Sequence, residues 1–232
     1  MKIVVNDFVA GAQSAAGIAV IIDVFRAFSL AAYAFDAGAA AIFPVADLEQ
    51  ARQLKHTHPE RLLLGERYAQ PLTGFDGGNS PAQLRRWSLL DREIIHTTHS
   101  GTQGLVNALY ADEVLTGALV NAGAIVRYIQ HRRPAQVTLV RMGYAACERC
   151  DEDDLCAELI RARLCDEEYP VPDIQARLRT APAAAKFFDS QSQSFAPQAD
   201  FDLCTAVDRF DFVLRLDRGC QPFRLQKVNV PS

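Results

Sequence analysis

Short apolar runs alternate with helical patterns along most of this chain, and that alternation constrains its fold more than any other feature. The run Ile18–Ile22 is continuous and mostly β-branched, which is typical of a strand buried on both faces. Similar patterns predict further strands at 40–45, 61–64, 94–95, 113–116 and 136–141. The segments between them predict helices at 27–37, 48–57, 103–110 and 120–130. The alternation favours an α/β fold in three layers (α/β/α), with a mostly parallel sheet covered by helices on both faces.

The composition of the sequence changes after Cys165. Prolines and a Ser/Gln-rich stretch predict shorter helices and loops there, and the runs at 210–216 and 223–228 predict a terminal pair of strands. We therefore expect residues 1–165 to form an α/β core that carries most of the site. Residues 166–232 would form a small C-terminal α+β portion, packed on the same domain or forming a small second lobe.

The composition of the 232-residue chain excludes several function classes. Its formal net charge is −4 and its sequence pI is near 5.7, so it lacks the basic stripe of a nucleic-acid-binding protein. The apolar stretch at 15–22 is too short to span a bilayer, and we see no secretory signal. We therefore expect a cytoplasmic protein whose cysteines are thiols, with no nucleic-acid or membrane partner. A homodimer fits the prevalence of two-fold assemblies.

Four polar clusters follow the predicted apolar runs. They are Asp23–Arg26, Gly65–Arg67, Gly74–Pro81 and Thr97–Thr102. Ligands of open α/β sheets bind beyond the carboxyl ends of the strands, where such clusters would meet. Carboxylates, guanidinium groups, hydroxyls and glycines together suit a phosphate group and a hard metal ion. We therefore predict a site for a small anionic phosphoester at this edge of the sheet.

The first two clusters each pair a carboxylate with an arginine. Asp23 could bind a metal ion or act as a nucleophile, and Arg26 could hold a phosphate with its planar fork. Glu66 and Arg67 repeat the same pairing. The alternative for Asp23 is that it caps the following helix. A haloacid-dehalogenase phosphatase would need a second aspartate at position 25, where this chain has a phenylalanine.

The Gly74–Pro81 segment is dense in turn residues. Asp76 could coordinate a cation, and Asn79 or Ser80 could bond a phosphate oxygen beside the flexible Gly77-Gly78 backbone. A structural loop in which Ser80 and Pro81 begin a helix explains part of the segment equally well.

The Thr97–Thr102 segment joins a predicted strand to a predicted helix. Hydroxyls and amides at such a turn favour an anion, whereas helix capping alone needs only one hydroxyl. His99 could be the general acid for a leaving alcohol, or simply a polar loop residue.

A run of cysteines and acids spans Cys147–Cys156. Cys147, Cys150 and Cys156 could bind zinc, but a fourth ligand is not evident. The acids that follow Cys150 suit the first turn of a helix, yet there are more of them than capping needs. We therefore assign at least one acid in this run to the site.

Taken in order, these segments resemble the 2-phosphosulfolactate phosphatase family. The resemblance rests on Ile21–Arg26, Gly65–Arg67, Gly74–Pro81, Thr97–Thr102, Glu152–Ala157 and Asp208–Val213. It implies a three-layer α/β/α enzyme that uses Mg²⁺ to hydrolyse (R)-2-phospho-3-sulfolactate to 3-sulfolactate and phosphate, a reaction of coenzyme M biosynthesis. The residues that fall on the family's motif positions are Asp23, Arg26, Glu66, Arg67, Asp76, Asn79, Ser80, Thr98, Gly101, Thr102, Glu152, Asp153 and Cys156.

The resemblance and the chemistry of the residues together give one assignment of roles. The candidate catalytic residues are Asp23, Arg26, Glu66, Arg67 and Cys156. The candidate substrate-binding residues are Asn79, Ser80, Thr98, Ser100, Gly101 and Thr102. The candidate Mg²⁺ ligands are Asp23, Asp76, Glu152 and Asp153. The nucleophile stays open between a water activated by the metal ion, Asp23 and Cys156.

Two stretches depart from the family's pattern. His99-Ser100 stands where the family commonly has Thr-Asn, and Cys147–Cys150 stands where it is usually glycine-rich. Both stretches lie in loops that we expect to contact the ligand. The alternative function is therefore a non-catalytic protein that binds an anionic metabolite in the same pocket.

Overall fold

The computed structural model describes residues 1–230, and within that range ten strands form one mixed sheet. The strands are β1 (Lys2–Asp7), β2 (Ile18–Ile22), β3 (Ala41–Pro44), β4 (Leu62–Arg67), β5 (Gln70–Pro71), β6 (Glu93–Thr97), β7 (Glu113–Gly117), β8 (Gln136–Arg141), β9 (Phe212–Asp217) and β10 (Arg224–Asn229). The α-helices are α1 (Phe8–Gln13), α2 (Ala27–Asp36), α3 (Leu48–Thr57), α4 (Gly101–Asn107), α5 (Ala122–Arg132), α6 (Asp151–Leu164), α7 (Pro172–Arg179), α8 (Ala185–Phe188) and α9 (Gln198–Cys204). Short 3₁₀ helices are η1 (Pro81–Arg86), η2 (Leu119–Asn121) and η3 (Pro182–Ala184).

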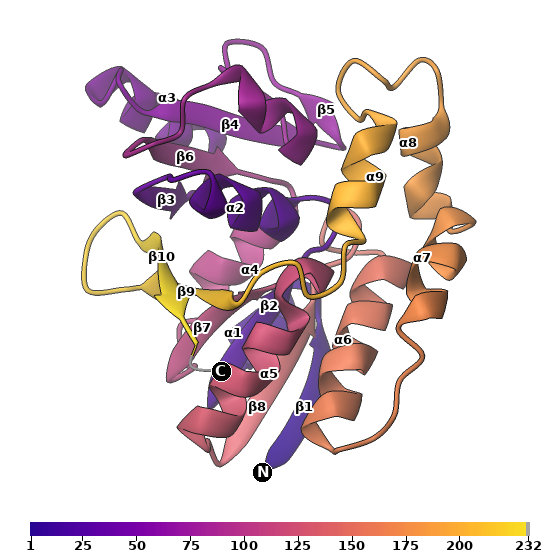
Figure 1. Ribbon diagram of the computed structural model, residues 1–232. Coiled ribbons are helices and arrows are strands. Elements are labelled where there is room, and N and C mark those ends of the chain that lie inside the picture. The colour runs from indigo at the N-terminus through magenta and orange to yellow at the C-terminus, as the bar shows by residue number, and fades with distance from the viewer. Residues whose placement is uncertain (231–232) are drawn as a thin grey trace.

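The sheet consists of two parallel halves joined by an antiparallel hairpin. Its strand order is β1-β8-β2-β7-β9-β10-β3-β6-β4-β5. Strands β1, β8, β2 and β7 run parallel to one another, as do β3, β6 and β4. The β9–β10 hairpin pairs antiparallel with β7 on one side and with β3 on the other. Figure 1 shows this hairpin in yellow between the two halves. The C-terminal strand pair therefore completes the centre of the sheet.

Helices cover both faces of the sheet, which confirms the predicted three-layer α/β/α fold. Alternate residues of β2 point to opposite faces, as the period of a strand requires. Ile21 belongs to a core cluster with α2 and α4, whereas Val20 belongs to a second cluster with α5 and α6. A smaller third cluster packs α3 against Leu63 and Ile95 of β4 and β6.

The agreement between predicted and observed elements is best where burial dominates the sequence pattern. The predicted strands at 18–22 and 136–141 coincide with β2 and β8, and the predicted helix at 48–57 coincides with α3. Asp47 caps α3 as expected, with its carboxylate accepting a hydrogen bond from the Gln50 amide at 2.7 Å. The helix predicted at 103–110 begins and ends earlier, as α4, because Gly101 and Thr102 already adopt helical geometry.

Strand β1 and helix α1 are not among the elements predicted from the sequence. Strand β1 lies at the edge of the sheet and pairs with β8 alone, so none of its residues is fully buried. Its apolar run, Ile3–Val5, is shorter than the five-residue run of the central strand β2 and is flanked by polar residues.

The polar clusters come from both parallel halves of the sheet. Strands β2 and β8 run in one direction and β4 and β6 in the opposite one, because three antiparallel pairings separate the two halves. The predicted clusters follow the carboxyl ends of all four strands, and the loops that carry them line one cavity together with residues near α8. In Figure 1 helices α8 and α9, drawn in orange and yellow, lie on this side of the molecule. Residues from the last third of the chain therefore close the site.

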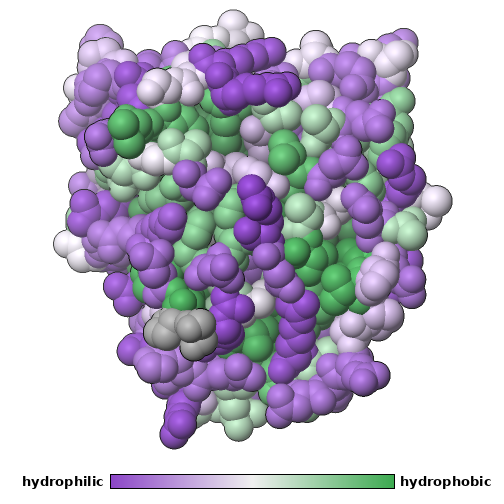
Figure 2. Space-filling view, viewed as in Figure 1, coloured by the Kyte–Doolittle hydropathy of each residue, from purple (hydrophilic) through white to green (hydrophobic). Residues whose placement is uncertain are grey.

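The surface in the same view is mostly hydrophilic, with smaller hydrophobic patches between the charged residues (Figure 2). Among the described residues, no helix has the length and apolar character needed to cross a membrane.

Shortening Leu214 tests whether the hairpin supports the whole sheet. Leu214 lies on β9, is fully buried, and belongs to the core cluster that contains α2 and α4. We expect Leu214→Ala to lower the free energy of unfolding by about 3 kcal/mol, measured by denaturant titration. Val5→Ala, on the partly exposed edge strand β1, is the control and should cost less than about 1 kcal/mol. Equal losses for the two variants would contradict the central role of the hairpin.

Candidate active site

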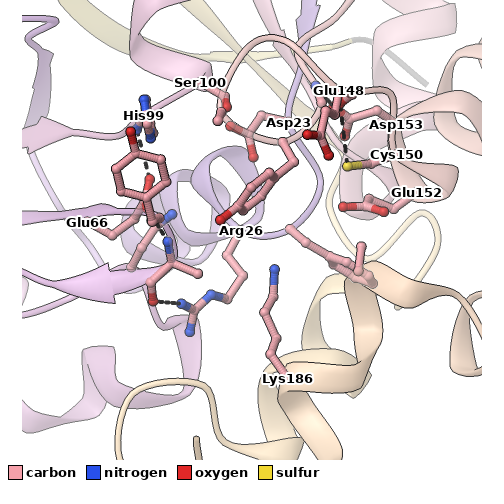
Figure 3. Close-up of a pocket in the computed structure, with 18 of the residues that line it drawn as sticks. Asp23, Arg26, Glu66, His99, Ser100, Glu148, Cys150, Glu152, Asp153 and Lys186 are labelled. Atoms are coloured by element: carbon pink, nitrogen blue, oxygen red, sulfur yellow. Dashed lines mark hydrogen bonds between the residues drawn. The ribbon is translucent and has the colours of Figure 1, made fainter.

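A cavity of about 710 Å³ lies beyond the carboxyl ends of strands from both halves of the sheet. Its walls come from the segments that follow β2, β4, β6 and β8 and from residues 182–195 near α8. Figure 3 shows acidic side chains from several of these segments pointing into one space. The predicted site residues that line the cavity are Asp23, Arg26, Glu66, Asn79, Ser100, Glu152 and Asp153.

Asp23 directly follows the buried strand β2. One carboxylate oxygen accepts a hydrogen bond from the Ala27 amide at 3.2 Å, so the residue does cap α2 as the alternative interpretation proposed. The other oxygen faces α4 so closely that a Cβ at position 101 would lie 2.8 Å from it, and only glycine fits there. Burial, together with repulsion by Glu66, raises the pKa of Asp23 to about 6. Asp23 therefore caps α2 and is also a buried carboxylate of the cavity whose charged form is disfavoured.

Glu152 and Asp153 enter the cavity from the first turn of α6. Asp153 uses both oxygens to accept backbone hydrogen bonds, from Val24 and from Gly143, each at 2.8 Å. Glu152 is 4% exposed, and its Oε2 atom has no hydrogen-bond partner. Burial raises the pKa of Glu152 to about 7, opposed by the charge of Lys186, and burial also raises the pKa of Asp153 well above its usual range. Asp153 therefore positions two loops, whereas Glu152 keeps an oxygen available to a ligand.

The loop after β8 depends on an unusual backbone. Gly143 adopts a φ of +61°, and a Cβ there would lie 2.0 Å from the Glu148 carbonyl oxygen. This conformation lets the Gly143 amide reach Asp153 and brings the Ala146 amide to the Ser100 hydroxyl at 2.9 Å. Ser100 therefore connects the β6 and β8 loops at the cavity wall.

Glu66 connects two further loops. Its oxygens accept hydrogen bonds from the amides of Ala69, at 2.7 Å, and His99, at 2.8 Å. The ring of His99 packs edge-on against Tyr68 with centroids 4.4 Å apart. The Nδ1 atom of His99 is buried without a hydrogen-bond partner, and the residue lines the cavity. Glu66 thus holds His99 in place through its backbone.

Arg26 forms a buried ion pair that the sequence did not reveal. Its Nη1 atom donates to Asp200 Oδ2 at 2.8 Å, and the two side chains are 2% and 0% exposed. Asp200 also accepts hydrogen bonds from the Ser80 hydroxyl at 2.8 Å and from the Ala82 amide at 2.9 Å. The charge of Arg26 is therefore neutralised by α9, and the Ser80 hydroxyl is committed to the same network.

Several predicted site residues lie outside the cavity lining. Arg67 donates to the carbonyls of Glu66 and Ala46 and to Thr97 Oγ1, and Asp76 binds Lys55 at 2.8 Å. The residues absent from the lining are Arg67, Asp76, Ser80, Thr98, Gly101, Thr102 and Cys156.

Thr98 and Thr102 bind each other across the start of α4. The Thr98 amide donates to Thr102 Oγ1 at 3.0 Å, and the Thr102 amide donates to Thr98 Oγ1 at 3.1 Å. These bonds satisfy the first turn of the helix and leave both hydroxyls committed within the protein.

Cys156 lies on α6 in the core cluster with α5 and is fully buried. Burial raises the pKa of its thiol well above the usual range, which favours the protonated and unreactive form. Cys147 is exposed on the loop before α6. Within residues 1–230, no three Cys, His, Asp or Glu side chains converge to hold a metal ion, and this includes the three cysteines considered for zinc.

Asn79 reaches the cavity from the loop before η1. Its Oδ1 atom lies 3.0 Å from His96 Nε2, on the buried end of β6. Burial, reinforced by the charge of Arg67, lowers the pKa of His96 to about 4, so His96 is neutral at physiological pH. A neutral ring donating to Oδ1 fixes the orientation of the Asn79 amide.

Sequence reasoning missed Lys186 and Asp200. Both lie in the C-terminal segment, where the sequence predicted only short helices and loops. Neither belongs to a motif, and both lie on short helices. Only the tertiary fold brings them to residues that follow β2.

The donor set of the cavity fits a hard cation such as Mg²⁺. Asp23 and Glu152 are buried carboxylates whose pKa values are raised by burial, and one oxygen of Glu152 has no partner. Mg²⁺ is commonly held by one or two carboxylates, with waters and substrate oxygens as its other ligands. The lack of a third converging side chain is compatible with that mode of binding.

The comparisons with known proteins agree with this architecture. A sequence model of the family described as 2-phosphosulpholactate phosphatase matches residues 5–219. A protein of Bacillus subtilis (strain 168) is 29% identical over 215 residues, which cover 92% of each chain. A protein of Prochlorococcus marinus (strain MIT 9303) is 32% identical over 212 residues, which cover 84% of this chain and 87% of its own. Both relatives are named probable 2-phosphosulfolactate phosphatase.

The fold, the acidic cavity and these matches define a phosphoric monoester hydrolase. More narrowly, the chain belongs to the 2-phosphosulfolactate phosphatase family, which confirms the resemblance seen in its motifs.

A double-mutant cycle tests the buried ion pair. Arg26→Met and Asp200→Asn each leave the partner's charge buried and unpaired, so each should lower the free energy of unfolding by about 3 kcal/mol. The double variant should lose clearly less than the sum, with a coupling energy of about 2 kcal/mol in denaturant titrations. The exposed pair of Arg127 and Asp211 is the matched control, and water should make its coupling much smaller. Additive losses at Arg26 and Asp200 would contradict the pairing.

The low pKa of His96 predicts a pH dependence of stability. Between pH 6.5 and about 4, His96 is protonated in the unfolded chain but neutral in the folded protein. Lowering the pH through this range therefore favours the unfolded chain and destabilises the fold. Relative to His96→Gln, the wild type should lose about 3 kcal/mol of unfolding free energy between pH 7 and pH 4. Urea titrations at several pH values measure this difference. Parallel pH profiles for the two proteins would show that folded His96 titrates normally.

Proposed function

We propose that this protein is a Mg²⁺-dependent phosphatase of a small acidic phosphomonoester, with (R)-2-phospho-3-sulfolactate as its substrate. The observation that carries the proposal is the pair of buried carboxylates, Asp23 and Glu152, in one cavity with an unpartnered oxygen. Keeping two such groups close together is costly unless a cation or a proton is bound there.

Asp23 and Glu152 would hold the Mg²⁺ ion, with Asp153 fixing the backbone on both sides. When bound, the ion would supply the positive charge that offsets the negative charge of the phosphoryl oxygens. This assignment keeps two of the four predicted metal ligands, gives Asp153 a positioning role, and leaves Asp76 paired with Lys55.

The other polar groups of the cavity would orient the substrate. Asn79 offers its amide, held by His96, and Ser100 lies where the β6 and β8 loops meet. The partnerless Nδ1 of His99 would donate a hydrogen bond or a proton to the leaving oxygen. Glu66, with both oxygens bonded to backbone amides, would position His99.

The substrate assignment rests on the names of the relatives and on the size of the cavity. At about 710 Å³ the cavity has room for a three-carbon ester bearing several anionic groups. A cytoplasmic location, a place in coenzyme M biosynthesis and a homodimer remain parts of the same proposal.

Phosphate release from 2-phospho-3-sulfolactate tests the proposed function directly. The wild type should release phosphate with Mg²⁺ and lose this activity with EDTA. Asp23→Asn and Glu152→Gln should each lower kcat/KM by at least about 100-fold, because each removes charge from the site. Magnesium titrations of the wild type and both variants would show whether the loss includes weaker metal binding.

Thermal unfolding should show that both variants remain folded, since removing an unpaired buried charge relieves repulsion. Cys156→Ala should keep activity within about tenfold, because the thiol lies in the core away from the cavity. Turnover that resists EDTA would contradict the metal assignment. Binding of the ester without phosphate release would favour the non-catalytic alternative.

A further inference from the structure

Lys186 is the one lysine that lines the cavity within the described part of the chain. It lies on α8, directly after the η3 turn, and its side chain is half-buried. Figure 3 shows the ammonium group rising from this wall toward the space in front of Asp23 and Glu152. The rings of Phe25 and Phe187 flank it, with centroids 5.8 and 5.2 Å from Nζ.

The ammonium group of Lys186 has no polar partner among residues 1–230, whereas the two arginines of the lining are both committed. Arg26 is paired with the buried Asp200, and it also donates to the Phe195 carbonyl. Arg149 is paired with Asp154 at 2.7 Å. Within the described residues, Lys186 is therefore the cavity cation whose donors remain available.

The surroundings of Lys186 disfavour its charged form. Burial, together with repulsion by Arg26, lowers the pKa of Lys186, although the charges of Glu152 and Asp23 oppose that shift. A lysine whose ammonium group lies between aromatic rings without an ion-pair partner can bind an anionic group of a ligand.

The position of Lys186 suggests which part of a substrate it meets. Asp23 and Ser100 come from the strand ends, whereas Lys186 comes from the C-terminal segment on another side of the cavity (Figure 3). A phosphoryl group held near Asp23 and Glu152 would leave the rest of the ester directed toward Lys186. A lysine is a compact charge that can bind either a carboxylate or a sulfonate.

We propose that Lys186 binds an anionic group of the substrate that is not transferred, and so selects phosphomonoesters that carry a carboxylate or sulfonate beside the ester. The proposal rests on the proposed function, since it names the substrate class read by the same site. It assigns Arg26 to positioning, through Asp200, and Lys186 to direct contact with the substrate.

The test compares esters that differ in their anionic groups. Phosphate release would be measured on 2-phospho-3-sulfolactate, 2-phospholactate and isopropyl phosphate, the last of which keeps the branched ester but lacks a second anion. Lys186→Gln should reduce the preference for the two acidic esters over isopropyl phosphate by roughly 10- to 100-fold, mainly through KM. Lys186→Arg should restore part of this preference.

Lys227→Gln is the matched control. Lys227 also lies over an aromatic ring, that of Phe212 at 4.2 Å, but it is on β10 away from the cavity. It should leave the preference among the three esters unchanged. Thermal unfolding should show that Lys186→Gln remains folded, because the Lys186 side chain is only half-buried.

An equal loss on all three esters, or no loss on any, would overturn the proposal. If the wild type hydrolyses none of them, the proposed function fails and calorimetry decides the role of Lys186 separately. In that experiment Lys186→Gln should weaken binding of 3-sulfolactate by roughly 10- to 100-fold and binding of inorganic phosphate much less. Equal or absent effects on the two ligands would again overturn the proposal.

Discussion

The buried ion pair between Arg26 and Asp200 connects the parts of the chain that enclose the cavity. Arg26 follows the central strand β2, and Asp200 lies on α9, far along the sequence. The same carboxylate also holds Ser80 and the Ala82 amide. Three polar groups from two segments therefore depend on one carboxylate, and each would lose a partner if that carboxylate were removed. The pair fixes how the C-terminal helices close over the edge of the sheet.

Around this pair, the acids of the cavity divide into two kinds. Glu66 and Asp153 use both oxygens to hold backbone amides, and they set the shape of four loops. Asp23 and Glu152 are less fully hydrogen-bonded to the protein, and burial raises their pKa values. The first kind stabilises the loops, and the second makes the cavity attractive to cations. The site can tolerate the repulsion between Asp23 and Glu152 because Glu66 and Asp153 hold the surrounding backbone rigid.

The sequence predicted the fold class, and half of the site residues that it predicted line the cavity. Continuous apolar runs revealed β2 and β8, and the polar residues after them revealed Asp23 and Glu152. It could not distinguish a hydroxyl that faces a ligand from one that caps a helix, as Thr98 and Thr102 show. It also could not find Lys186 or Asp200, because their importance comes from contacts across more than a hundred residues. Local patterns encode strands and caps, whereas the closing wall of the site is encoded only by the tertiary fold.

The position of the β9–β10 hairpin has a consequence for how this protein is made. Strands β7 and β3 meet only through the hairpin, whose residues are the last part of the sheet in the sequence. During translation the sheet cannot be completed until residues 212–229 leave the ribosome, and until then the edges of β7 and β3 are uncovered. Exposed strand edges of this kind invite pairing with other chains. The nascent protein therefore has a period of vulnerability to aggregation that ends only when its final strands insert.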